Sequence, residues 1–124
     1  MSKFSGLKVL LVEDESFVAL MIEDMLQDLG CEIVASVARL KEACDIASTA
    51  ELDLAVLDIN LGGERSFPIA NILQERGVPF MFSTGYGKNG LPSELSGSPV
   101  LSKPFAAKEL EETLSSALGL PLRT

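Results

Sequence analysis

Hydrophobic and polar residues follow two different spacings in turn along this chain. Short, continuous apolar runs are each followed by a longer stretch in which apolar residues recur every three or four positions. A continuous apolar run is typical of a strand that is buried on both faces, and the longer spacing is typical of an amphipathic helix. The pattern predicts strands over residues 8–12, 32–37, 54–58, 78–83 and 100–102, and helices over residues 16–29, 40–50, 66–77 and 106–118.

The apolar faces of these helices and the residues at their ends support the assignment. The residues expected to point inward are Val18, Met21, Ile22, Met25 and Leu29 in the first helix, Leu40, Ala43, Cys44 and Ala47 in the second, Ile69, Ile72 and Leu73 in the third, and Leu110, Leu114 and Leu118 in the last. Gly30, Gly77 and Gly119 follow three of the helices, where glycine commonly ends a helix. Ser66 is expected to be the N-cap of the third helix, with Pro68 in its first turn.

Strands that alternate with helices through short connections favour parallel pairing with right-handed crossovers. We therefore expect an α/β protein with a doubly wound, five-stranded parallel sheet in the order 2-1-3-4-5, flanked by helices as in flavodoxin-like folds. Strand 32–37 is less apolar than the others and is expected to be more exposed. Segment 85–99 holds four glycines and two prolines, which limits a fourth helix to a turn or two near residues 92–95.

Composition narrows the class of protein. The chain has 124 residues, 47% of them apolar, so we expect one domain over residues 1–124 with no output domain. The net charge of −8 argues against a nucleic-acid partner. No apolar run approaches the length of about 18 residues that a membrane helix needs, and the N-terminus lacks the core of a signal peptide. Cys31 and Cys44 show no metal-type spacing and are interpreted as buried thiols, so we expect a cytoplasmic protein.

The chain contains no histidine. This absence excludes Ser-His-Asp catalysis, histidine-ligated zinc and a role as a histidine phosphocarrier. Neither a Walker A loop nor a GxGxxG sequence is present, so nucleotide binding through those loops is excluded as well.

Polar residues follow four of the predicted strands, at the carboxyl ends where open parallel sheets bind ligands. These segments are Glu13-Asp14-Glu15, Asp58, Ser83-Thr84-Gly85 and Lys103-Pro104. Carboxylates gathered in one cleft must be partly protonated or neutralised by a cation, and an all-oxygen set favours Mg²⁺ or Mn²⁺. A carboxylate nucleophile, a divalent cation, a lysine and oxyanion donors together indicate phosphoryl transfer.

In this order, the four segments resemble those of the receiver domain of two-component response regulators. The resemblance covers the whole chain, through residues 9–15, 57–58, 83–85 and 103–105. It implies that Asp58 accepts a phosphoryl group from a sensor histidine kinase or a histidine phosphotransfer protein. It also implies a Mg²⁺ site, with Asp14 as a direct ligand beside Asp58, Glu13 acting through water and Asn60 offering its backbone carbonyl. Thr84 and Lys103 would contact the phosphoryl oxygens, with the Lys103–Pro104 bond in cis.

The chain departs from the family pattern in two respects, one of which is a short stretch between Thr84 and Lys103 with a reduced fourth helix. Receivers usually carry an aromatic residue three positions before the lysine, and Val100 stands there instead, so the usual coupling between the threonine and that ring is in doubt. The sequence over 82–87 resembles the single-domain subgroup nicknamed FATGUY, whose members are associated with HWE-type histidine kinases. Tyr86 is either a loop anchor or a substitute for the missing aromatic switch.

Several functions agree with these residues. The first is a phosphoacceptor that signals through a downstream protein target, or acts as a phosphate sink or shuttle, and that is not an enzyme beyond its own phosphorylation and dephosphorylation. The second is a Mg²⁺-dependent small-molecule phosphohydrolase, although Asn60 stands where such enzymes carry a second acid and the chain has no room for a cap. The third is a pseudo-receiver that binds a partner without phosphorylation, against which the intact set of acidic residues, threonine and lysine argues.

Three local features are open to more than one interpretation. Asp58 taken alone could cap a loop, and only the complete set of segments favours the functional role. Phe17 is either a core residue or part of a docking surface. Segment 85–99 is either a surface loop or a switch that becomes ordered on phosphorylation.

Overall fold

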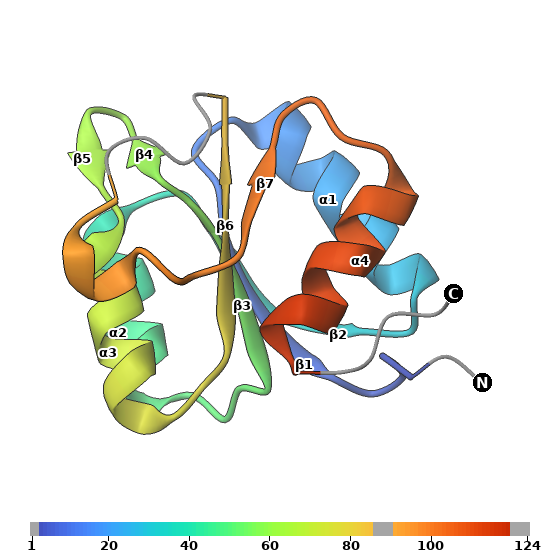
Figure 1. The fold of residues 1–124 in the computed structure, drawn as a ribbon, viewed down its shortest axis with the longest axis horizontal. Coiled ribbons are helices and arrows are strands. Elements are labelled where there is room, and N and C mark those ends of the chain that lie inside the picture. Colours follow the sequence, from blue (N-terminus) through green and yellow to red (C-terminus); the bar gives the residue numbers. More distant parts are fainter. Residues whose placement is uncertain (1–2, 86–90, 120–124) are drawn as a thin grey trace.

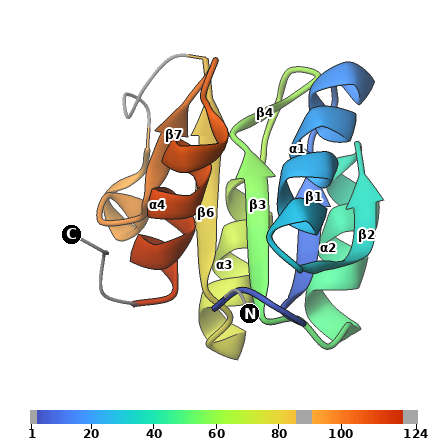
Figure 2. The ribbon, with the colours of Figure 1, turned by 90° about the vertical axis from the view of Figure 1, so that its right-hand side faces the viewer.

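The sheet is at the centre of the computed structural model, which describes residues 3–85 and 91–119. Its strands are β1 (Lys8–Val12), β2 (Glu32–Val37), β3 (Leu54–Asp58), β6 (Phe80–Thr84) and β7 (Val100–Ser102). Figure 1 shows this sheet nearly edge-on between the helices. The strands are parallel and lie in the order β2-β1-β3-β6-β7, which can be followed in Figure 2. This order confirms the predicted 2-1-3-4-5 arrangement, and the fourth strand is offset slightly from its predicted range.

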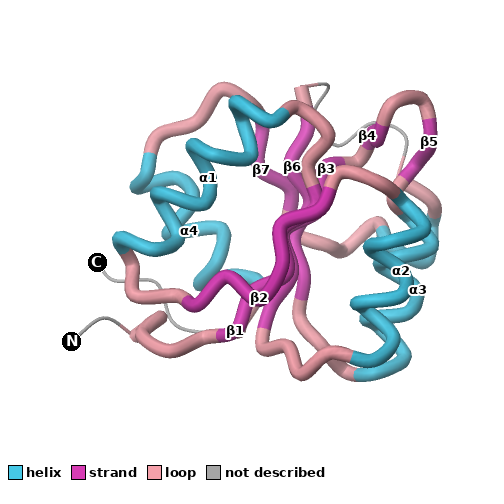
Figure 3. Tube along the Cα trace, turned by 180° about the vertical axis from the view of Figure 1, so that it is seen from behind, coloured by secondary structure: helices cyan, strands magenta, loops and turns pink. Residues whose placement is uncertain are grey.

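Two layers of helices cover the sheet. They are α1 (Ser16–Asp28), α2 (Leu40–Thr49), α3 (Phe67–Arg76) and α4 (Ala107–Ala117). Helices α2 and α3 pack on one face of the sheet, and α1 and α4 pack on the other (Figures 2 and 3). The predicted boundaries agree with the observed ones to within one residue at each end. Among the residues that the structure describes, none of the helices has the length and apolar character needed to cross a membrane.

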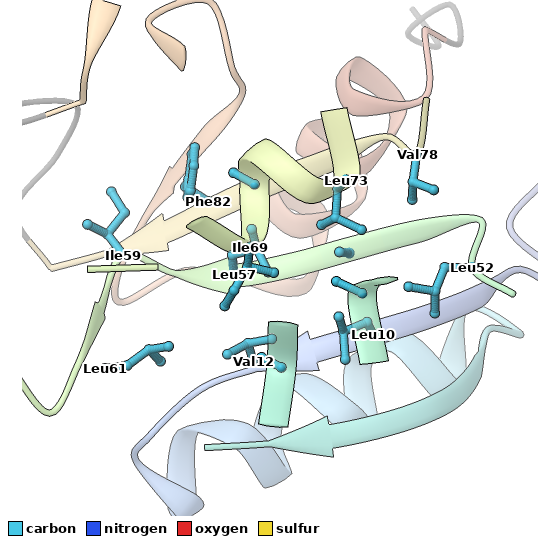
Figure 4. Packing of buried hydrophobic residues seen from close by; sticks show 14 of the residues in the cluster. Leu10, Val12, Leu52, Leu57, Ile59, Leu61, Ile69, Leu73, Val78 and Phe82 are labelled. Carbon is cyan, nitrogen blue, oxygen red and sulfur yellow. The ribbon is translucent and has the colours of Figure 1, made fainter. Parts of the chain in front are cut away.

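The alternation of side chains along each strand divides the interior into two cores. Leu10, Val12, Leu57 and Phe82 pack against α2 and α3 in the first core, which Figure 4 shows from close by. The other residues of the same strands, such as Leu11 and Val56, pack against α1 and α4 in the second core. Strand β3 is buried along its whole length, which explains its unbroken apolar sequence, whereas the edge strand β2 is partly exposed as predicted.

The buried face of α1 differs from the predicted one. Its fully buried residues are Ala19, Ile22 and Leu26, whereas Met21, which was expected to point inward, is 38% exposed. Successive residues on a helix are rotated by about 100°, so a face centred on Ile22 leaves Met21 at its solvent side. Phe17 is 88% exposed, so its interpretation as a core residue is wrong.

The prediction that the Ser66 side chain caps α3 is also wrong. Ser66 does occupy the N-cap position, but its backbone torsions of φ −81° and ψ 2° are not extended, and its side chain makes no capping hydrogen bond. A capping hydroxyl reaches the free N–H groups of the first turn from an extended backbone. Ser66 is instead fully buried, and its Oγ finds no hydrogen-bond partner in residues 3–85 or 91–119.

A small hairpin follows Asp58, where the sequence predicts only a polar loop. Strands β4 (Asn60–Leu61) and β5 (Glu64–Arg65) pair antiparallel around Gly62 and Gly63. The two glycines have φ values of +60° and +97°, the left-handed pair that a tight hairpin turn requires. The Asn60 side-chain oxygen accepts a hydrogen bond from the Gly63 N–H at 2.9 Å. The Gly-Gly pair was therefore the signal that could have predicted the hairpin.

The short fourth helix is confirmed in the part of segment 85–99 that the structure describes. Over residues 91–99 the helical structure is one 3₁₀ turn, η1 (Ser93–Leu95), and Leu95 is buried in the core under α2 and α3. Residues 86–90, which include Tyr86, lie outside the described residues. The switch proposed for that tyrosine and for the full segment stays a prediction.

One side chain joins the ends of two neighbouring helices. Arg76, at the end of α3, donates hydrogen bonds from Nη1 to the carbonyl oxygens of Ala47 and Ala50 at 2.6 and 2.8 Å. The carbonyls at the end of a helix lack partners within the helix, and a cation beside them also interacts favourably with the helix dipole. Arg76 therefore fixes the end of α2 against α3.

Arg76→Met should lower the free energy of unfolding by about 1–2 kcal/mol, the typical contribution of hydrogen bonds from a charged donor that is partly exposed. Urea unfolding measures the change. Arg65→Met is the control, because Arg65 is exposed on the hairpin, and its stability should be close to wild type. Equal stability of the two variants would mean that the contacts of Arg76 contribute nothing.

Candidate functional site

Four strands deliver polar residues to one end of the sheet. Glu13 and Asp14 follow β1, Asp58 ends β3, Thr84 ends β6, and Lys103 follows β7. A cavity of about 180 Å³ opens there, lined by Asp14, Glu15, Asp58, Asn60, Thr84, Gly85 and Lys103. The strand order places β1 and β3 side by side, so residues far apart in sequence meet as predicted.

Three carboxylates form the acidic part of this site. Glu13, Asp14 and Asp58 can each present an oxygen within 4.8 Å of the other two. Glu13 and Asp58 are 2% and 6% exposed, whereas Asp14 is open to solvent. Buried carboxylates are stable only when they are paired, protonated or bound to a cation, so the surroundings of each one are informative.

Lys103 is the cation that contacts these carboxylates within the described part of the chain. Its Nζ lies 2.7 Å from Glu13 Oε1 and 3.4 Å from Asp58 Oδ2. Its backbone N–H donates to the Thr84 carbonyl at 2.8 Å, and the following bond to Pro104 is cis, as predicted. Burial lowers the pKa of Lys103, but the hydrogen bond to Glu13 and the charge of Asp58 raise it by more, so the ammonium stays charged.

Glu13 has a more direct role in the structure than the sequence suggested. Its Oε1 accepts from Lys103, and its Oε2 accepts from the backbone N–H of Glu15 at 3.1 Å. Both carboxylate oxygens are thus engaged by the protein itself. The sequence predicted Glu13 and Lys103 as members of the site, but it gave no signal that their side chains would pair.

The carboxyl group of Asp58 is strongly perturbed. Burial is the largest cause, and the adjacent Glu13 carboxyl adds to it, so that the pKa rises from 3.8 to about 7. The charge of Lys103 and the backbone N–H of Asn60 oppose this rise, and the Asn60 N–H lies 3.3 Å from Asp58 Oδ1. Asp58 therefore gains a proton readily unless a further positive charge enters the site.

The hairpin contributes a contact that sequence reasoning missed. The backbone N–H of Gly62 donates to Asp14 Oδ2 at 2.9 Å. Asp14 is thereby held between the end of β1 and the β4–β5 turn, and Asn60 holds the same turn from its other side. The hairpin thus orients one carboxylate of the site.

Thr84 ends strand β6 and Val100 begins strand β7. Thr84 is 3% exposed and lines the cavity, and Gly85 beside it is exposed. Val100 is half-buried and packs against the core under α2 and α3. The position that usually holds an aromatic residue is thus filled by a smaller, packed side chain.

The residues present fit a hard divalent cation. The donor set is all oxygen, which suits Mg²⁺ and Mn²⁺. Among the residues that the structure describes, three carboxylates face one lysine, which leaves an excess of negative charge there. The raised pKa of Asp58 shows the same imbalance, since like charges this close favour protonation or a cation.

An exposed apolar surface borders the site, and we call it the α1 patch. It consists of Phe17, Leu20 and Met21 of α1, which are 88%, 60% and 38% exposed. A groove of about 450 Å³ runs beneath it and is lined by Glu13 and Asp14 as well as by Phe17 and Leu20. The acidic site and the α1 patch therefore share a border.

Comparison with known proteins agrees with this geometry. The chain matches the sequence profile of the response regulator receiver domain over residues 9–115. The transcriptional regulatory protein YvrH of Bacillus subtilis is 28% identical over 116 residues, which cover 89% of this chain and 48% of that protein. The chain spans about half the length of the curated relatives it matches.

Two solved structures are similar along nearly their whole length. SdrG from Sphingomonas melonis Fr1 has a TM-score of 0.81 and 37% identity, over 95% of this chain and 99% of that one. The receiver domain of the sensor histidine kinase PA1611 from Pseudomonas aeruginosa PAO1 has a TM-score of 0.79 and 27% identity, over 93% of this chain and 99% of that one. That domain was solved with a magnesium ion coordinated in its active site cleft.

Proposed function

Because this chain belongs to the response regulator receiver domains of two-component signalling, we propose that Asp58 is its phosphoacceptor. The phosphoryl donor is the phosphohistidine of a sensor kinase or of a histidine phosphotransfer protein. The observation that carries the proposal is the environment of Asp58, a nearly buried carboxylate whose Oδ2 lies 3.4 Å from the Lys103 ammonium at the wall of a cavity. A structural aspartate gains nothing from a setting that raises its pKa to about 7.

The transfer step uses groups that line the cavity. A carboxylate oxygen of Asp58 attacks phosphorus, the P–N bond to the histidine breaks, and the leaving imidazole nitrogen keeps the electron pair and takes up a proton. The Lys103 ammonium and the Thr84 hydroxyl stabilise the phosphoryl oxygens as charge builds up on them. Asp58 must be deprotonated to attack, so a cation that lowers its pKa favours the reaction.

We propose that Mg²⁺ is held by Asp14 and Asp58, with Glu13 near it and the backbone carbonyl of Asn60 as a further ligand. When bound, the ion supplies positive charge that favours the ionised Asp58 and neutralises phosphoryl oxygens. The magnesium ion in the similar PA1611 receiver domain supports this assignment. Mn²⁺ suits the same oxygen donors and should substitute for it.

The α1 patch is the surface that we propose for the phosphoryl donor. A donor histidine must enter the cavity, and the protein that carries it must then rest on the surface that borders the cavity. Phe17 and Leu20 are exposed there, and apolar side chains that lie outside a core beside a reactive site are typical of a docking surface. We propose a sensor kinase of the HWE type as the donor, from the resemblance to the FATGUY subgroup.

The output that we propose is contact with a downstream protein, or phosphoryl flow itself as a sink or shuttle. The protein would act as an acceptor rather than as an enzyme on other substrates. Asn60, rather than an acid, stands two residues after Asp58, which supports an acceptor over a phosphohydrolase. Release of phosphate from a small phosphomonoester at a sustained rate would favour the hydrolase instead.

Acetyl phosphate that carries radiolabel tests the proposal without a kinase. In the presence of Mg²⁺ the label should appear as an acid-stable, base-labile acyl phosphate, and peptide mapping should locate it at Asp58. EDTA should prevent uptake, and Mn²⁺ should restore it. Label on a different residue would overturn the assignment of Asp58, and no label under any condition would favour a pseudo-receiver.

Asp14→Asn should weaken Mg²⁺ binding by about 10–100-fold or more, because it removes one ligand charge. Isothermal titration calorimetry with Mg²⁺ measures this directly, and uptake of label should fall in parallel. Asp24→Asn is the matched control, since Asp24 is an exposed aspartate of α1 away from the cavity lining. Unchanged Mg²⁺ affinity in Asp14→Asn would remove Asp14 from the metal site.

A further inference from the structure

Ser83 is a buried hydroxyl to which the proposed mechanism gives no role. It lies in β6 and is 1% exposed, and its Oγ has no hydrogen-bond partner among the residues that the structure describes. An unsatisfied buried hydroxyl costs about 1–3 kcal/mol, and alanine at the same position would avoid that cost. Native proteins keep few such groups, and each one calls for an explanation.

Strand pairing puts Ser83 beside the reactive carboxylate. Its partners in the sheet are Asp58 on β3 and Leu101 on β7. Side chains alternate between the two faces of a strand, and Met81 and Leu101 both belong to the core under α1 and α4. Ser83 is two residues from Met81, so it shares that face. Asp58 shares it too, because Val56 belongs to the same core.

The path of Lys103 brings its side chain to this place. Lys103 follows β7, and its backbone N–H is bonded to Thr84 at the end of β6. Its ammonium nevertheless reaches Asp58 on β3 and Glu13 after β1. Strand β6 lies between β7 and β3, so the Lys103 side chain crosses the end of β6, on the face that carries Ser83.

We propose that Ser83 is a positioning residue for Lys103 in the phosphorylated protein, an inference that rests on the proposed function of Asp58. An ammonium group has three N–H donors, and in this structure two of its contacts are with Glu13 and Asp58. Phosphorylation moves negative charge outward from Asp58, and the ammonium follows it away from Glu13. Ser83 Oγ then accepts the hydrogen bond that Glu13 gives up, and it holds Lys103 on the phosphoryl group.

Two alanine variants test this inference. Ser83→Ala removes the hydroxyl that we propose to hold Lys103. Ser66→Ala is the matched control, because Ser66 is also fully buried with an unpartnered Oγ, but it lies at the start of α3 on the opposite face of the sheet. Ser83→Thr keeps the hydroxyl and tests for rescue.

The first measurement is stability with and without Mg²⁺ and beryllofluoride, which mimics the acyl phosphate. Without them, both alanine variants should be at least as stable as wild type, since neither hydroxyl has a partner. Mg²⁺ and beryllofluoride should raise the melting temperature of Ser83→Ala by less than they raise that of wild type or of Ser66→Ala. The increase in Ser83→Thr should be larger than the increase in Ser83→Ala. A merely structural role would change the free protein and leave the increase unaltered.

The second measurement is the initial rate of labelling by acetyl phosphate. Ser83→Ala should be slower by about 10-fold or more, the effect of losing one hydrogen bond to a charged group, whereas Ser66→Ala should match wild type. If wild type takes label and Ser83→Ala equals it in rate and in stabilisation, the inference about Ser83 is wrong and the proposed function stands. If wild type takes no label, the proposed function fails, and the role of Ser83 fails with it.

Discussion

Asp58→Asn should abolish phosphoryl uptake and, without divalent cations, should make the protein more stable at neutral pH. The two effects have one cause, because the environment that makes Asp58 reactive also makes its charge unfavourable. The pKa of Asp58 rises from 3.8 to about 7, chiefly through burial and the adjacent Glu13. Asparagine has a similar shape, carries no charge and has no carboxylate to attack phosphorus.

The sign of the stability change follows from the direction of the pKa shift. A carboxyl group with a raised pKa in the folded state contributes its full stabilisation below its unfolded pKa, and loses it as the pH rises through the folded value. For Asp58 this loss runs from about pH 4 to about pH 7. Above that range wild type holds an unfavourable charge that the variant lacks.

Urea unfolding in EDTA at several pH values measures the difference. The free energy of unfolding of Asp58→Asn should exceed that of wild type by about 1–3 kcal/mol at pH 8, and by less at pH 5. This range allows for the lost contact with Lys103 and for the partial solvation of Asp58. Mg²⁺ should stabilise wild type more than the variant. Asp24→Asn, an exposed control, should show a difference that does not change with pH. If the stability gained in Asp58→Asn does not change with pH, the charge of the Asp58 carboxylate is not what destabilises wild type.

Lys103→Met should have the opposite effect on stability. Glu13 and Asp58 are 2% and 6% exposed, and Lys103 is the cation that pairs with both of them among the described residues. Removing one partner of a buried ion pair typically costs about 3–5 kcal/mol, because the remaining charge is left uncompensated. The loss should be largest in EDTA at pH 8, and acidification or Mg²⁺ should reduce it.

A second substitution separates the ion pair from the packing of the lysine side chain. Glu13→Gln combined with Lys103→Met removes both charges, and it should recover a large part of the stability lost in Lys103→Met. Lys108→Met replaces an exposed lysine of α4 and should stay within about 0.5 kcal/mol of wild type. If the double variant is no more stable than Lys103→Met, lost packing rather than an uncompensated charge explains the loss.

The fold was predictable because its main signals are local. Continuous apolar runs such as Leu54–Leu57 reflect burial on both faces, and the spacing of apolar residues in the helices reflects one inward face. The exact rotation of α1 was not predictable in this way. Its sequence has apolar residues on more than half of its circumference, so only packing against the sheet decides that Ile22 is central and Met21 peripheral.

The membership of the candidate site was predictable for a related reason. Parallel strands bring their carboxyl ends together, so residues that follow them must meet. Which of them pair is a question of side-chain geometry across three strands, and the contact between Glu13 and Lys103 has no local signal. The buried, unpartnered hydroxyls of Ser66 and Ser83 are likewise invisible in a sequence, because burial and hydrogen bonding depend on residues distant in the chain. The chemical roles of the site residues stay predictions until they are tested.

The sheet keeps the two cores apart, and this separation has an evolutionary consequence. Core residues under α2 and α3, such as Leu73, are on the far side of the sheet from Phe17 and the rest of the α1 patch. Substitutions at sites that share no contacts usually have additive effects on stability. Stabilising substitutions in the core under α2 and α3 would therefore add to, and can offset, the stability lost when the α1 patch diverges toward a new signalling partner.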